Sequence, residues 1–186
     1  MSPIKRLLRR IPALRWCALR YTKDIRQRRR DIAWNDTQSV LTAIGNITIA
    51  WAGINLILNR FIEADRAERG PMFEDHLPKA FTRKLDYLEK VEGDPRWAPD
   101  RITIFKTFRP ELAELNTYRV DLVHGLLTRN GYAPEWTIHV AKESKDKLAR
   151  RTVAQTSDDI HAFAQRLSDM GERLSAFFMP MLGKQS

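Results

Sequence analysis

The sequence predicts an all-α protein, an up-down bundle of four to five helices with a small β-hairpin before the last helix. Apolar residues recur at alternating spacings of three and four over most of the chain, which is the pattern of helices that bury one face. Period-two alternation, which is typical of strands, is centred on residues 136–140. With 186 residues and 43% hydrophobic content, the chain is long enough to form one domain with a sizeable core.

Basic residues are concentrated at the N-terminus. Residues 1–30 contain 11 Lys and Arg and a single acid, whereas the whole chain has a net charge of +9, so the remainder is close to neutral. We therefore divide the chain into a basic N-terminal arm, residues 1–30, and a helical domain, residues 31–186. The arm predicts a basic amphipathic helix interrupted near Pro12. Such an arm binds RNA phosphates or an anionic membrane surface, or is a solvated charge run. The arginines expected to make these contacts are Arg6, Arg9, Arg10, Arg28, Arg29 and Arg30.

The arm also bears on localisation. It is rich in Arg and poor in acids, as transit peptides are, but no uninterrupted apolar segment follows its first basic residues, so no secretory signal is predicted. A cytoplasmic protein is the expectation, and organellar import is the alternative. The single Cys17 excludes an intramolecular disulfide and a cysteine zinc cluster. The four His are scattered, so we expect no metal and no cofactor.

The first helix of the domain is predicted from a heptad-like apolar stripe. Residues 37–59 contain no charged side chain, which is long enough for a membrane span, but Asn, Gln and Gly dilute the segment. We interpret it as a long packed helix whose second face meets another subunit. The stripe consists of Val40, Ile44, Ile47, Trp51, Ile54, Leu58 and Phe61.

Two further helices follow in order. Gly70 and Pro71 mark a turn, and Pro78 opens a second helix. A third helix is predicted from Pro110 to about Arg129. The apolar face of the second helix contains Leu77, Phe81, Leu85, Leu88 and Val91, and the residues that separate it from the third are Gly93, Pro95 and Pro99.

A hairpin and a last helix complete the prediction. One strand contains Trp136, Ile138 and Val140, the chain turns at 144–147, and residues 151–154 return. Thr156 and Asp159 form a weak capping box that announces the last helix. The core face of this helix is predicted to contain Ile160, Phe163, Leu167, Met170, Leu174, Phe177 and Met181.

The third helix has an arginine on its apolar stripe. Arg119 falls in register with Leu112, Leu115, Leu122 and Leu126. A guanidinium at that position is costly to bury unless another group satisfies it. His124 follows five residues later, roughly 140° further round the helix. The two side chains can converge on one site across a dimer formed by the helices that contain Trp51 and Arg119.

The segment Arg119-Val120-Asp121-Leu122-Val123-His124, followed by Gly125, resembles the signature of the HEPN superfamily of small helical bundles. That signature is an Arg followed after four to six residues by a His. The residue after the Arg is usually Asn in the family, and here it is Val120. The resemblance implies a HEPN-like helical domain over residues 31–186 and a homodimeric, metal-independent endoribonuclease with a role as a toxin or defence component.

The resemblance also implies roles for individual residues. His124 would act as general base on a ribose 2′-hydroxyl, and Arg119 would stabilise charge on the attacked phosphate. Asn116 and Asp121 are candidates for orienting His124 or the phosphate. Tyr118 and Trp136 are aromatic residues that either stack on a base or pack in the core.

Three alternatives remain open at this point. In the first, Arg119 pairs with Asp121, Glu111 or Glu114, and His124 is an ordinary surface histidine of the helix. In the second, the chain is a catalytically inactive HEPN-like module that binds a protein or RNA. In the third, it is a peripheral membrane protein that uses the basic arm and the uncharged helix.

Overall fold

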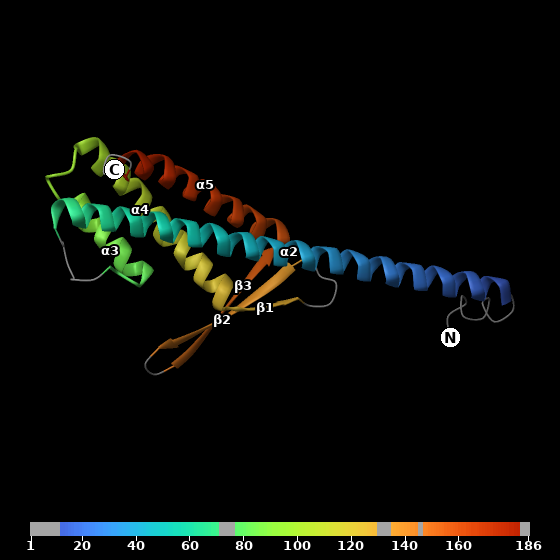
Figure 1. The fold of residues 1–186 in the computed structure, drawn as a ribbon. Coiled ribbons are helices and arrows are strands. Elements are labelled where there is room, and N and C mark those ends of the chain that lie inside the picture. Colours follow the sequence, from blue (N-terminus) through green and yellow to red (C-terminus); the bar gives the residue numbers. More distant parts are fainter. Residues whose placement is uncertain (1–11, 71–76, 130–134, 145–146, 183–186) are drawn as a thin grey trace.

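The computed structural model describes residues 12–70, 77–129, 135–144 and 147–182 (Figure 1). Over these residues the chain forms four helices and one three-stranded antiparallel sheet, in the order α2, α3, α4, β1, β2, β3, α5. The protein is therefore mostly α, with the small sheet placed immediately before the last helix. Both features agree with the fold class predicted from the sequence.

Residues 12–30 of the arm and the first helix of the domain form one continuous helix. α2 runs over Pro12–Arg69, 58 residues, and begins at the proline where a break was expected. Proline suits the first position of a helix because the N–H that it lacks has no partner there. The helix ends at Gly70, which adopts a left-handed φ of 80° and donates its N–H to the carbonyl of Arg66 at 2.9 Å. In Figure 1 the N-terminal half of α2 projects beyond the other elements.

The C-terminal half of α2 packs along α5 (Ser157–Leu182). The capping box at the start of α5 is confirmed, because Thr156 N donates to Asp159 Oδ2 at 2.8 Å and Asp159 N donates to Thr156 Oγ1 at 3.1 Å. The predicted core face of α5 is largely confirmed, but Phe178 is fully buried where Phe177 was expected. Met181 lies outside the residues whose side chains are described. The fully buried residues of this helix pair are Val40, Ala43, Ile47, Ile54, Leu58, Ile62, Ile160, Leu167, Met170, Leu174 and Phe178.

α3 (Phe81–Glu92) packs against α4 (Pro99–His124). The start predicted for α4, at Pro110, is wrong. α4 begins at Pro99, where Ala98 is extended, and Pro110 lies inside it. The earlier start follows from Phe105 and Phe108, which are buried and continue the apolar face of α4 toward its N-terminus.

The end predicted for that helix is also wrong, because α4 stops at His124 and residues 126–129 form a strand. β1 (Leu126–Arg129) pairs with β2 (Glu135–Ser144), which pairs with β3 (Lys147–Thr156). The β2–β3 hairpin is the one predicted from period-two alternation, and its inward residues are Trp136, Ile138 and Val140. Tertiary pairing with β2 decides the conformation of residues 126–129 and overrides their helical spacing.

One ion pair joins the sheet to α2. Arg129 Nη1 of β1 lies 2.6 Å from Asp36 Oδ2, and both side chains are largely buried, with 11% and 21% exposed. The same Asp36 oxygen accepts from Trp136 Nε1 at 3.2 Å. The guanidinium of Arg129 also packs over the Trp136 ring at 5.4 Å. The sheet is therefore attached where α2 leaves the body of the molecule.

Candidate functional site

Arg119 lies on α4 and faces Trp51 of α2. Its Cζ is 5.7 Å from the centre of the indole ring, a cation–π contact that offsets part of the cost of desolvating the guanidinium. Its Nε is buried and has no hydrogen-bond partner, although the side chain as a whole is partly exposed. An unmet buried donor costs roughly 1–3 kcal/mol. The protein therefore holds this guanidinium in place without satisfying it.

The acids that a purely structural role would require are engaged elsewhere. Glu111 accepts from Arg173 of α5 at 2.9 Å, and Glu114 accepts from Arg166 of α5 at 2.9 Å. No described carboxylate forms an ion pair with Arg119. Arg119 therefore differs from Arg109, Arg129, Arg166 and Arg173, which each contact an acid.

His124 is the last residue of α4 and is exposed to solvent. Gly125 follows in an extended conformation and donates its N–H to the carbonyl of Asp121 at 2.9 Å. A Cβ on Gly125 would come 2.5 Å from Ile138 Cγ2 and closer still to the Asp121 carbonyl oxygen. Only glycine fits this passage from α4 to β1, so the sequence His-Gly fixes where the helix stops and where the imidazole is presented.

The structure does not bring Arg119 and His124 together within one chain. Five residues of helix separate them by about 7.5 Å along the axis and about 140° around it. Arg119 faces α2, whereas His124 faces solvent. A site that uses both side chains on one phosphate therefore requires a second copy of the protein or a rearrangement of α4.

The two supporting candidates differ in position. Asn116 lies three residues before Arg119, on the same side of α4, and is half-buried. Asp121 is 7% exposed and lies two residues after Arg119, on the opposite side of the helix. Asn116 is thus the better placed of the two for a shared ligand with Arg119.

A second cation near Trp51, and one that is buried, was not predicted from the sequence. Lys84 of α3 is 3% exposed, and its Nζ donates to Asn55 Oδ1 of α2 at 2.7 Å. Burial lowers the pKa of Lys84. Phe81, one turn earlier on α3, contacts the Trp51 ring at 4.3 Å between centroids. The signal was present, since Lys84 interrupts the apolar face of α3 as Arg119 interrupts that of α4.

The predicted arm residues lie in two groups. Arg28, Arg29 and Arg30 are exposed on the projecting half of α2, together with Arg26 and Lys23. The remaining predicted arm contacts, Arg6, Arg9 and Arg10, lie outside the described residues. These exposed cations form a basic surface on the N-terminal half of α2. Arg119 contacts the same helix further along, at Trp51.

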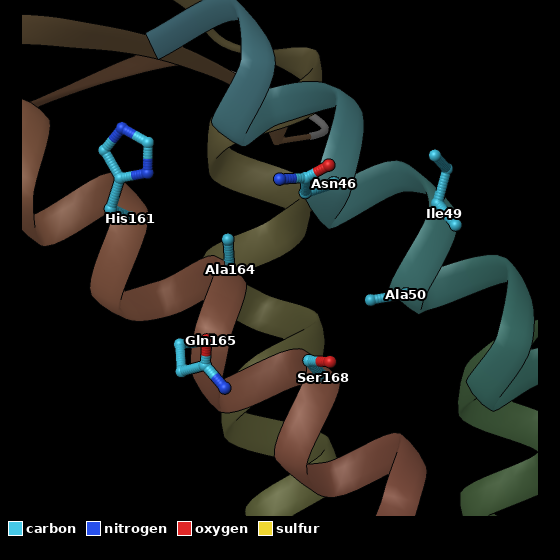
Figure 2. Close-up of a pocket in the computed structure, with 7 residues that line it drawn as sticks. All are labelled: Asn46, Ile49, Ala50, His161, Ala164, Gln165 and Ser168. Carbon is cyan, nitrogen blue, oxygen red and sulfur yellow. The ribbon is translucent and has the colours of Figure 1, made fainter. Parts of the chain in front are cut away.

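A polar groove lies between α2 and α5. It has a volume of about 320 Å³, and Figure 2 shows the residues around it. Next to it, Ser39 Oγ and His161 Nε2 share a hydrogen bond of 2.6 Å. No other hydrogen bond of His161 occurs within the described part of the chain, so a third group that would orient it as a catalytic base is missing there. The lining residues are Asn46, Ile49, Ala50, His161, Ala164, Gln165 and Ser168.

The described ranges also bear on two other kinds of site, a metal centre and a membrane span. No group of three or more His, Cys, Asp or Glu side chains in these ranges is arranged to hold a metal ion. α2 satisfies the length and hydropathy of a membrane span over part of Thr22–Glu68, a test that core helices also pass. Because the same segment buries Val40, Ile47 and Ile54 in the core, composition alone does not make it a span.

Comparisons of the chain with protein-family models, with curated proteins and with solved structures give no match.

Proposed function

We propose that this chain is a HEPN-type, metal-independent endoribonuclease that acts as a cytoplasmic homodimer, with a role as a toxin or defence component. We also propose that the helices form an up-down bundle, as expected from the sequence. The observation that supports it best is Arg119, a partly exposed guanidinium held against Trp51 with a buried Nε and no described acid.

A phosphate would pair with the part of the Arg119 guanidinium that is not buried, since the buried Nε is closed to a ligand from solvent. A guanidinium stays charged at physiological pH, and its planar donors match the oxygens of a phosphate. Trp51 restrains the side chain before any ligand arrives, so little conformational entropy is lost on binding. Arg119 would accordingly stabilise negative charge that develops on the phosphate oxygens during cleavage.

His124 supplies the group that a metal-free cleavage needs. Its imidazole would accept the proton of a ribose 2′-hydroxyl while the 2′-oxygen attacks the adjacent phosphorus. The bond from phosphorus to the 5′-oxygen of the next nucleotide breaks and this oxygen takes a proton from water, which leaves a 2′,3′-cyclic phosphate and a 5′-hydroxyl. Because Arg119 and His124 diverge within one chain, two copies would contribute to each site.

Cleavage of single-stranded RNA in EDTA tests the proposal. We expect the wild type to produce 2′,3′-cyclic phosphate ends and both Arg119→Ala and His124→Ala to lose at least about 100-fold in rate. Matched controls are Arg166→Ala, which removes a guanidinium from an exposed ion pair, and His161→Ala, which removes another exposed imidazole. Equal losses in the controls, or intact RNA with the wild type, would contradict the proposal.

An inactive RNA-binding module is the second candidate. The exposed basic half of α2 supports it, since phosphate binding by these cations does not depend on Arg119 or His124. RNA binding that weakens steeply with salt, without cleavage, would favour this candidate. Replacing Arg28, Arg29 and Arg30 with Gln should then weaken binding to every RNA sequence and reduce its salt dependence.

A further inference from the structure

α2 has a second apolar face that no described element covers. On the side opposite the buried residues of the core, five apolar or small residues point outward over four turns of the helix, and we call them the outer stripe. Its three large members are each more than half exposed. The outer stripe consists of Leu41, Gly45, Ile49, Ala52 and Leu56.

Gly45 is unexplained by the isolated chain. It lies in the middle of a long helix, where glycine is roughly 1 kcal/mol less favourable than alanine. A Cβ at this position would meet nothing within 4 Å, so the fold of one chain does not require glycine. A missing side chain on an outward helix face permits the close approach of another backbone.

We propose that a second copy of this chain packs antiparallel along the outer stripe, with a two-fold axis passing between Thr48 and Ile49. In this register Leu41 of one copy lies opposite Leu56 of the other, and Gly45 of one copy lies opposite Ala52 of the other. The Gly45–Ala52 pairs lie near the axis, where the helices approach closely. The Leu41–Leu56 pairs lie at the two ends of the stripe. The stripe is thus complementary to itself, as a two-fold interface requires.

Charge selects the antiparallel orientation. Residues 20–30 of α2 contain six Lys and Arg and one Asp. A parallel pair would place these two basic segments side by side, where like charges repel. In the antiparallel pair the two basic segments lie at opposite ends of the dimer, and Arg29 of each copy lies opposite position 68 of the other, where Glu68 is exposed.

The length of the contact suits a stable dimer. From Trp34 to Glu63 α2 spans 30 residues, or about 45 Å and roughly four heptads. Stable dimers bury roughly 1,200 Å² or more, and a helix pair of this length is on that scale. Trp34 is exposed beside the stripe and would add its indole surface at each end.

The two-fold position and the candidate site lie on different sides of α2, because Trp51 is 6% exposed and faces the core whereas the outer stripe faces away from it. Trp51, which holds Arg119, lies within one helical turn of the two-fold position along α2. The significance of this placement for RNA cleavage rests on the proposed ribonuclease function. The helix pairing itself rests on the outer stripe alone, so the two can fail separately.

Disulfide trapping tests the pairing and its direction. In a Cys17→Ser chain, the antiparallel register brings a cysteine at position 41 of one copy close to a cysteine at position 56 of the other. A mixture of Leu41→Cys and Leu56→Cys chains should therefore form a cross-linked heterodimer under mild oxidation. Leu41→Cys alone should not cross-link, because its two copies are about 22 Å apart along the helix. Cross-linking of Leu41→Cys alone would show a parallel pair and overturn the proposal.

Sedimentation equilibrium without RNA provides a second test. The wild type should be dimeric, and Leu41→Glu should weaken the dimer at least about 100-fold because an unpaired carboxylate would be buried. Met179→Glu, at an exposed apolar position of α5, is the matched control and should leave the dimer unchanged. A monomeric wild type would overturn the pairing, as would a wild type that partitions as a monomer onto anionic vesicles. RNA cleavage measured on the same samples decides the proposed function independently.

Discussion

Tyr118, the neighbour of Arg119 on α4, is held in an apolar setting. Its hydroxyl donates to Gln155 Oε1 at 2.6 Å, and its ring packs against Phe163 at 4.2 Å between centroids. Burial, with a smaller contribution from Asp159, raises the pKa of Tyr118 to about 12. This tyrosine, which was a candidate for base stacking, is therefore a neutral packing residue at physiological pH.

The titration of Tyr118 can be measured directly. Subtracting the ultraviolet phenolate titration of Tyr118→Phe from that of the wild type should reveal one group with a pKa of about 12. Since the folded pKa is raised, the stability contributed by the neutral phenol is present below pH 10 and is lost as the pH rises from about 10 to 12. A difference titration centred near 10 would show that Tyr118 is solvated.

Gly125 allows a second prediction about a single residue. Gly125→Ala should lower the free energy of unfolding by about 1–3 kcal/mol, because the new methyl group meets Ile138 and the Asp121 carbonyl. Gly171→Ala is the control, since its nearest neighbour, Ile54 Cγ1, lies at an ordinary 3.8 Å and helix propensity then favours alanine. Urea unfolding measures both, and equal effects would contradict the account of how α4 ends.

Single residues show how far the sequence alone could define the site. The three-and-four spacing placed Arg119 on a packed face, and the structure agrees. The same spacing could not say which acids were already engaged, because the contacts of Glu111 and Glu114 with α5 join residues more than 50 positions apart. The spacing also could not predict the hydrogen bond between Lys84 and Asn55.

At the scale of elements, the ion pair between Asp36 and Arg129 joins the sheet to α2. Asp36→Ala should lower the free energy of unfolding by about 3 kcal/mol, because it removes the carboxylate that pairs with Arg129 and accepts from the indole N–H of Trp136. Glu114→Ala removes an acid from the exposed pair with Arg166 and should cost less than about 1 kcal/mol. Comparable losses in urea unfolding would show that the sheet is held by apolar packing alone.

Helix interiors were more predictable than element ends. The buried stripe of α2 and the β2–β3 hairpin follow from periodicity, which reports on many residues at once. The start of α4 and strand β1 were missed, because prolines at 99 and 110 both suit a helix start and because β1 forms only through pairing with β2. Local spacing cannot decide a boundary that a distant strand determines.

On the scale of the whole molecule, α2 connects three surfaces. Its projecting half presents Arg28, Arg29 and Arg30 to solvent, its inner face forms the core with α5, and its outer stripe is available to another chain (Figure 1). Trp51 on the same helix holds Arg119 of α4. A single helix thus links the surface proposed to bind RNA, the residue proposed to hold a phosphate and the proposed dimer contact.

Mixing two inactive variants tests the central claim, that Arg119 of one copy and His124 of another form an RNA-cleaving site. Arg119→Ala and His124→Ala should each be inactive alone in EDTA. In a dimer of one with the other, one of the two sites keeps both residues, so an exchanged equimolar mixture should regain about a quarter of the wild-type activity. A mixture that stays inactive while the wild type cleaves would contradict a shared site, and a wild type that leaves RNA intact would contradict the function.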